Sequence, residues 1–156
     1  MALTLVRASI GDAELIWRMQ RAAFQPLLEK YQDFDLNPAC EPIEKVLMRL
    51  RQPFTYYYLL RLDGQDAGAI RVVDKQEPGK RKRISPLFVL PEYQGRGIAQ
   101  QAISAAEALH GAHFWELDTI AQEAGNCHLY EKMGYRLTGE NTPVNDRMTL
   151  VQYEKE

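Results

Sequence analysis

The chain has 156 residues, of which 46% are hydrophobic and 26% charged, and its formal net charge is −2. That size and balance are typical of a single soluble domain over residues 1–156, with no basic surface for nucleic acid and no membrane-spanning segment. Two cysteines, Cys40 and Cys127, form no CxxC pair and no signal-peptide pattern opens the chain, so we expect a cytoplasmic protein without a metal site.

The N-terminal segment is predicted to be a strand followed by a helix. A strand is expected over residues 3–8, and Ser9 followed by Asp12 has the spacing of a capping box. The helix should run to about Phe24, because apolar residues recur at helical spacing. Its predicted inward residues are Ile16, Met19 and Ala23. Between Pro26 and Pro38 we expect a loop or short helix rich in aromatic and acidic residues.

The rest of the chain alternates strands, turns and helices. The predicted elements, in chain order, are a helix beginning at Pro42, strands over 55–62 and 67–74 joined by Asp63-Gly64, a strand over 82–90, a helix over 98–110, a strand over 113–119, a helix over 123–133, and strands over 135–140 and 147–153.

The most informative segment is the strand end, glycine turn and helix start around residues 87–99. Gly95 and Gly97 have no Cβ, so the backbone can turn sharply and approach a ligand closely. The first N–H groups of a helix lack internal partners and lie at the positive end of its dipole, so the turn predicts an anion site suited to pyrophosphate. Arg96 adds a positive charge. The sequence contains neither a P-loop nor a three-glycine Rossmann fingerprint. The alternative to an anion site is an ordinary strand–turn–helix connection whose glycines bind nothing.

Gln94, Gly97 and Ala99 form a Gln-x-x-Gly-x-Ala pattern that resembles the acetyl-CoA pyrophosphate loop of the GNAT superfamily of N-acetyltransferases. The resemblance implies an α/β (α+β) fold, with a mixed, mostly antiparallel sheet flanked by helices and a V-shaped splay between strands 4 and 5. It also implies acetyl-CoA as cosubstrate. The cofactor-binding residues that it implies are Leu87, Phe88, Val89, Gln94, Gly95, Arg96, Gly97, Ile98, Ala99 and Asn126.

A second segment, Leu129-Tyr130-Glu131-Lys132-Met133-Gly134-Tyr135, is similar to another signature of the same family. The resemblance implies that the Tyr130 hydroxyl points at the thioester sulfur and protonates or holds the departing thiolate. The alternative is a tyrosine packed against the sheet. One departure is that the family usually has Asn seven residues before this Tyr, where Glu123 stands here, so Asn126 is expected to replace or shift the amide contact.

Pro86 marks a bulge or break, because proline cannot donate a hydrogen bond to a neighbouring strand. In related enzymes this strand bulges and splays from the next one, and its freed backbone groups pair with the pantetheine arm. Leu87, Phe88 and Val89 stand where that pairing would occur. A backbone N–H near Val89 is the expected oxyanion donor, since backbone donors are held rigidly. An edge-strand proline is the alternative.

The reaction implied is direct acetyl transfer to a primary amine, which must first lose a proton to a carboxylate or an ordered water. Some relatives carry a Glu on the motif strand, where Arg83 stands here. Glu116 and Asp118 share parity on the following strand and are the candidate catalytic carboxylates. Asp118 precedes Tyr130 by twelve residues, a spacing found for a catalytic Asp in some related aminoglycoside acetyltransferases. Surface or salt-bridged carboxylates are the alternative.

The acceptor pocket is expected to draw on residues 29–41, where Tyr31, Asp33 and Phe34 are the candidate substrate-binding residues. Carboxylates beside aromatic rings suit a cationic amine, although such a run is also typical of a solvated acidic loop. We expect the acceptor to be a small molecule or a peptide, with neither nucleic acid nor a membrane as partner, and a homodimer is left open.

Two functions from different classes compete. The favoured one is an acetyl-CoA-dependent N-acetyltransferase, and the second is a catalytically silent acyl-CoA-binding regulator that keeps the fold. A third, an RNA-binding module, rests only on the basic run Lys80-Arg81-Lys82-Arg83, which a solvated hairpin shoulder also explains.

Overall fold

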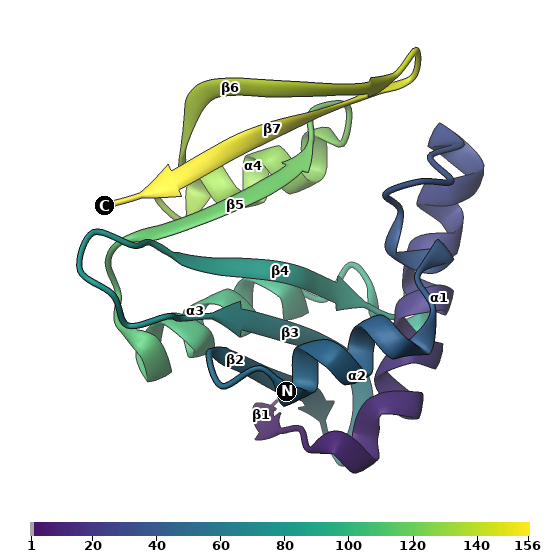
Figure 1. Ribbon diagram of the computed structural model, residues 1–156, viewed down its shortest axis with the longest axis vertical. Helices are drawn as coiled ribbons and strands as arrows, with labels where there is room; N and C mark the ends of the chain where they lie inside the picture. Colours follow the sequence, from purple (N-terminus) through teal and green to yellow (C-terminus); the bar gives the residue numbers. More distant parts are fainter. Residues whose placement is uncertain (1) are drawn as a thin grey trace.

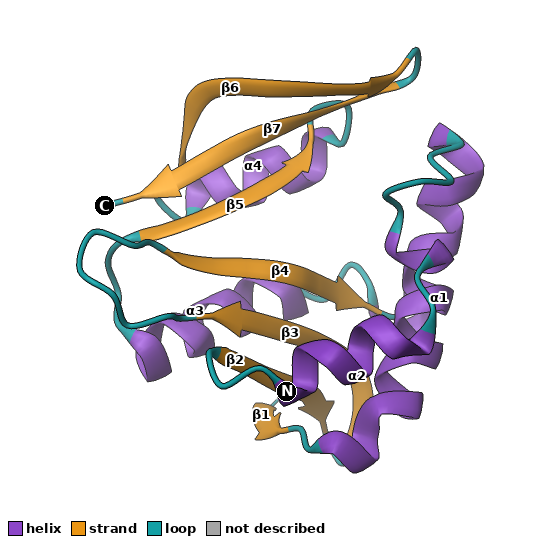
Figure 2. Ribbon diagram, viewed as in Figure 1, coloured by secondary structure: helices purple, strands orange, loops and turns teal. Residues whose placement is uncertain are grey.

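The computed structural model describes residues 2–156, which form one mixed seven-stranded sheet with helices on both faces (Figures 1 and 2). The strand order is β1-β2-β3-β4-β5-β7-β6, and β4 and β5 are its parallel neighbours. The strands are β1 (Leu3–Arg7), β2 (Thr55–Leu62), β3 (Gln65–Val73), β4 (Lys82–Val89), β5 (Trp115–Ile120), β6 (Arg136–Asn145) and β7 (Met148–Lys155). The α-helices are α1 (Ala13–Tyr31), α2 (Ile43–Arg51), α3 (Ile98–His110) and α4 (Ala124–Lys132). The mixed sheet with its β4–β5 splay confirms the predicted fold class.

The core is divided between the two faces of the sheet. On one face α1 and α2 pack on the strands, with Ile16, Val46 and Leu59 buried between them. On the other face α3 packs on the strands, and Ile103 of α3 and Trp115 of β5 are fully buried there. Figure 2 shows α1 and α2 in front of the sheet and α3 and α4 behind it. A ligand that passes through the sheet would therefore meet different elements on each face.

Helix α1 is longer than its sequence suggests. It continues through Pro26 to Tyr31 and ends at Gln32, which adopts a left-handed conformation with φ 57°. An interior proline costs a helix about 3 kcal/mol. Packing on both sides offsets that cost, because the Phe24 ring meets Phe88 edge-on at 5.8 Å and Tyr31 is buried. The predicted inward face, Ile16, Met19 and Ala23, is confirmed as buried.

The other boundaries agree with the predicted ones within a few residues, and the Ser9–Asp12 capping box is present, with the Ser9 N–H donating to the Asp12 carboxylate at 2.8 Å. The C-terminal hairpin is longer than predicted, since β6 continues to Asn145. No helix within residues 2–156 is both long and apolar enough to cross a membrane.

Candidate active site

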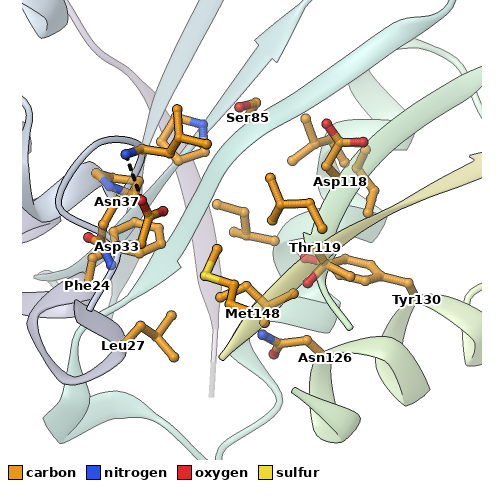
Figure 3. Close-up of a pocket in the computed structure, with 18 of the residues that line it drawn as sticks. Phe24, Leu27, Asp33, Asn37, Ser85, Asp118, Thr119, Asn126, Tyr130 and Met148 are labelled. Carbon is orange, nitrogen blue, oxygen red and sulfur yellow. Dashed lines mark hydrogen bonds between the residues drawn. The ribbon is translucent and has the colours of Figure 1, made fainter. Parts of the chain in front are cut away.

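A cavity of about 260 Å³ lies where β4 and β5 separate (Figure 3). Its walls come from both faces of the sheet and from elements far apart in sequence. The lining includes Phe24 and Leu27 of α1, Asp33, Leu36 and Asn37 of the following loop, Arg83 to Leu87 of β4, Leu117 to Ile120 of β5, Asn126 and Tyr130 of α4, and Met148 and Leu150 of β7. The sheet thus opens into a passage from the α1 side to the α4 side.

The passage exists because β4 and β5 pair over two positions, Lys82 with Trp115 and Arg83 with Glu116, and then diverge. Beyond that point the edge of β4 faces the cavity. The Leu90 N–H donates to Ala67 of β3 at 2.8 Å. Because successive N–H groups of a strand point to opposite edges, the Val89 N–H points to the opened side. The sequence-predicted oxyanion donor therefore faces the splay.

The divergence begins at a bulge on β4. Ile84 pairs with Val72 and Leu87 pairs with Ile70, so two residues of β4, Ser85 and Pro86, lie opposite Arg71 alone. The predicted irregularity at Pro86 is confirmed. A bulge bends its strand and increases its local twist, which turns β4 away from β5.

Arg71 of β3 stabilises this bulge through hydrogen bonds. Its guanidinium donates to the Ser85 carbonyl at 2.8 Å, to Gln52 Oε1 at 2.9 Å and to Thr55 Oγ1 at 3.3 Å. Arg71 is 9% exposed, and these acceptors are all neutral. Burial, followed by the charge of nearby Arg49, lowers the pKa of Arg71 to about 10, so it stays charged at neutral pH.

The predicted anion site lies at the start of α3, where Gly97 is the N-cap with φ 74°. The loop is exposed, and within residues 2–156 the backbone N–H groups from Gly95 to Ala99 donate to no protein acceptor. Gln94 instead turns back and donates to the Val89 carbonyl at 3.1 Å. The Arg96 guanidinium lies 5.4 Å from the centre of the Tyr93 ring. Free N–H groups at a helix start, beside a fixed cation, fit a pyrophosphate.

Tyr130 comes from α4 and directs its hydroxyl toward the cavity (Figure 3). Its ring is held by Tyr135 and Tyr153, whose ring centres lie 6.1 and 6.0 Å away. Burial, helped by nearby Cys127, raises the pKa of Tyr130 to about 12. The hydroxyl is therefore protonated at neutral pH and can donate a proton or hydrogen bond into the cavity.

The two candidate carboxylates of β5 lie on the same face but differ in their access to the cavity. Asp118 lines it and pairs with Arg83 at 2.5 Å. Glu116 is outside the lining, accepts a hydrogen bond from Gln152 at 3.2 Å, and lies 4.0 Å from Arg83. Arg83 therefore lies beside both carboxylates, and its shorter contact is with Asp118.

The three candidate acceptor-binding residues are placed differently. Asp33 lines the cavity. Phe34 is 62% exposed and lies outside the lining. Tyr31 is buried outside it, where its hydroxyl donates to Glu123. The structure thus brings Asp33 into the same cavity as Asp118 and Tyr130. Tyr31 and Phe34 lie outside that cavity.

The altered position Glu123 has a structural partner. Its carboxylate accepts from the Lys30 ammonium at 2.7 Å and from the Tyr31 hydroxyl, joining the start of α4 to the end of α1. Asn126, one turn later on α4, lines the cavity. Asn126 is therefore better placed than Glu123 to contact a ligand.

Sequence reasoning missed several lining residues because they are distant from both motifs. Met148 and Leu150 come from β7, which lies beside β5 only through the sheet topology. Arg71 is a charged residue in the apolar second half of β3, and only its place opposite the Ser85–Pro86 bulge gives it a role. The pairing of Arg83 with Asp118 could have been found from the parity of β4 and β5 once the two strands were known to be neighbours.

The chain resembles known acetyltransferases in both sequence and structure. Spermidine N(1)-acetyltransferase of Escherichia coli K12 is 26% identical over 87 residues, which cover 53% of this chain and 46% of that protein. The chain thus spans about half the length of the curated relatives it matches.

Two solved structures share the fold over nearly the whole chain. An acetyltransferase from Thermus thermophilus has a TM-score of 0.74 and 19% identity, with 99% of this chain and 97% of that chain covered. Spermidine N-acetyltransferase from Vibrio cholerae, in complex with CoA and spermine, has a TM-score of 0.77 and 17% identity, with 97% and 94% covered. The model of the acetyltransferase (GNAT) family matches residues 14–135, and the chain therefore belongs to that family.

Proposed function

We propose that the protein is an acetyl-CoA-dependent N-acetyltransferase that transfers the acetyl group directly to a primary amine of a small molecule or peptide. The observation that carries the proposal is the passage at the β4–β5 splay, with Tyr130 at its side and unpaired backbone donors before α3. In the Vibrio cholerae relative, the same fold holds CoA together with spermine.

The residues present fit the cosubstrate. The N–H groups from Gly95 to Ala99 would hold the pyrophosphate, and Arg96 would add charge beside it. The opened edge of β4 from Leu87 to Val89 would pair with the pantetheine arm as a further strand does. Bound acetyl-CoA supplies an activated thioester carbonyl.

In the proposed mechanism each catalytic step is assigned to a residue. Asp118, or a water beside it, takes a proton from the acceptor ammonium, and the neutral amine forms the new C–N bond. The Val89 N–H stabilises the oxyanion. As the C–S bond breaks, Tyr130 donates its proton or a hydrogen bond to the thiolate, and the second proton that the amine nitrogen loses on forming the amide passes to Tyr130 or to solvent. Asp33 binds a cationic part of the acceptor.

The test is release of free thiol from acetyl-CoA with a panel of amines, followed by mass spectrometry of the product. Mono-, di- and polyamines and a lysine peptide form the panel, because known relatives act on spermidine. Thiol release that depends on amine, with an acetylated product, is expected. CoA binding without turnover of any amine would contradict the proposal and favour the silent regulator.

A further inference from the structure

We propose, building on the acetyltransferase function above, that Asp33 is an anchor for a second ammonium group, so that the preferred acceptor is an aliphatic diamine or polyamine. The anchor is distinct from the place where the reacting amine is acetylated.

The Asp33 carboxylate is buried with one oxygen unused. It follows the left-handed end of α1, and its Oδ1 accepts the Leu36 N–H at 3.0 Å. That hydrogen bond explains why an aspartate is favoured at this position of the turn. It does not explain why the residue is 3% exposed, or why its buried Oδ2 has no hydrogen-bond partner within the described residues. A buried carboxylate oxygen without a partner is costly, so Asp33 favours a ligand that brings a donor.

The surroundings of Asp33 specify a cation on an aliphatic chain. The other charged groups of the lining, Arg83 and Asp118, are paired with each other at 2.5 Å. Asp33 is thus the unpaired charge of the described lining. Between it and the splay the walls include the apolar side chains of Leu27 and Met148 and carry no further unpaired charge among the described residues. Such walls suit methylene groups rather than further charges.

The ammonium group bound at Asp33 and the amine that is acetylated would lie at different places in the cavity. Asp33 lies on the α1 wall of the cavity, and Tyr130 lies on the opposite α4 wall (Figure 3). The reacting amine must be neutral and close to the thioester, on the Tyr130 side. The group at Asp33 must stay charged to pair with the carboxylate. One molecule satisfies both conditions when it has two amines joined by an aliphatic chain.

The first experiment compares diaminobutane with butylamine, which have the same chain but differ in the second amine. A hydrogen bond to a buried charged group contributes about 1.5–3 kcal/mol, so the wild-type protein should prefer diaminobutane by roughly 10- to 100-fold in kcat/KM. Asp33→Asn keeps the shape and can still accept the Leu36 N–H. It should remove that preference by raising KM for diaminobutane, and kcat/KM for butylamine should fall much less. Asp35→Asn, at an exposed acidic residue of the same loop, is the matched control.

Equal wild-type kcat/KM for the two amines would overturn the inference without any variant, as would an equal loss on both in Asp33→Asn. A calorimetric titration of diaminobutane into the protein saturated with CoA separates this inference from the proposed function. Binding that Asp33→Asn abolishes, in a protein that acetylates no amine, would support the anchor and refute the acetyltransferase. Turnover of amines that Asp33→Asn does not change would support the acetyltransferase and refute the anchor. The absence of both diamine binding and turnover would refute the anchor and the acetyltransferase.

Discussion

At the scale of single residues, the site combines one proton donor with several charges that are already paired. Tyr130 is protonated at neutral pH because burial raises its pKa to about 12. Asp118 faces the cavity but is paired with Arg83. Burial therefore keeps the Tyr130 hydroxyl protonated, whereas the proposed proton acceptor, Asp118, lies beside a cation.

Tyr130→Phe should lower kcat by about 100-fold, the lower end of the range for a positioned general acid, because a thiolate leaves fairly well without a proton. KM for acetyl-CoA should change much less, since the ring keeps its contacts with Tyr135 and Tyr153. Steady-state kinetics with the best amine measures both, and a thermal melt confirms folding. An unchanged kcat in a folded variant would make Tyr130 a packing residue.

Asp118→Asn should lower kcat by about 100-fold if this carboxylate accepts the amine proton. Glu116→Gln is the matched comparison, because Glu116 lies on the same face of β5 but outside the cavity lining, and it should reduce kcat far less. Both are measured with one amine at saturating acetyl-CoA. Equal, small effects would assign the proton to a water instead.

At the scale of secondary structure elements, the proposed cofactor site depends on two backbone features, the start of α3 and the bulge of β4. The first leaves N–H groups free before the helix. The second turns one strand edge toward the cavity. Each can be tested by a substitution that leaves the other intact.

Gly97→Glu should abolish CoA binding. Gly97 has φ 74°, a conformation that side chains rarely adopt, and the added carboxylate would repel a pyrophosphate. Gly79→Glu is the control, because Gly79 has φ 79° and open space around it but lies in the turn before β4. Calorimetry on both folded variants measures the affinity. Unchanged binding in Gly97→Glu would remove the loop from the site.

Arg71→Met should weaken CoA binding by about tenfold, because the Ser85 carbonyl would lose its buried donor and the bulge its support. ADP carries a pyrophosphate but no pantetheine, so its weaker binding should not change. Arg51→Met, at an exposed position of α2, controls for the lost charge. An equal loss for CoA and ADP would show a general loss of folding rather than a role at the splay.

At the scale of the whole molecule, α1 joins the two parts of the sheet across the splay. Strands β4 and β5 pair over two positions. The end of α1 contacts the other part, since Lys30 and Tyr31 bind Glu123, and Asn145 donates to the Tyr31 carbonyl at 2.9 Å. These contacts hold together the two walls of the cavity.

Glu123→Gln should lower the melting temperature at pH 7 by a few degrees, about 1–4 °C. Burial alone would raise the pKa of Glu123, but the hydrogen bonds from Lys30 and Tyr31 outweigh it and lower that pKa below 4.5. The stabilisation is therefore complete above pH 4.5 and is lost as the pH falls through the lowered pKa. Melting curves of both proteins should converge in acid. Glu77→Gln, at an exposed loop position, is the control, and a pH-independent difference would contradict the assignment.

The sequence by itself determined the element order, the irregularity at Pro86 and the motifs around Gly97 and Tyr130. These follow from short-range patterns, namely the spacing of apolar residues, turn residues and the missing donor of proline. Their structural counterparts are a helix beginning at Ile98 and a bulge opposite Arg71. The sheet with its splay was implied by the resemblance of those motifs to the GNAT superfamily.

Only the tertiary structure decided which charges meet. The continuation of α1 through Pro26 depends on packing against Phe88 and on the partners of Tyr31, which lie elsewhere in the chain. The pairing of Arg83 with Asp118 and the unpartnered oxygen of Asp33 depend on how the two walls approach each other. The physical reason is that periodicity reports which face of an element is buried, whereas the partner of a buried charge is set by distances between elements remote in sequence.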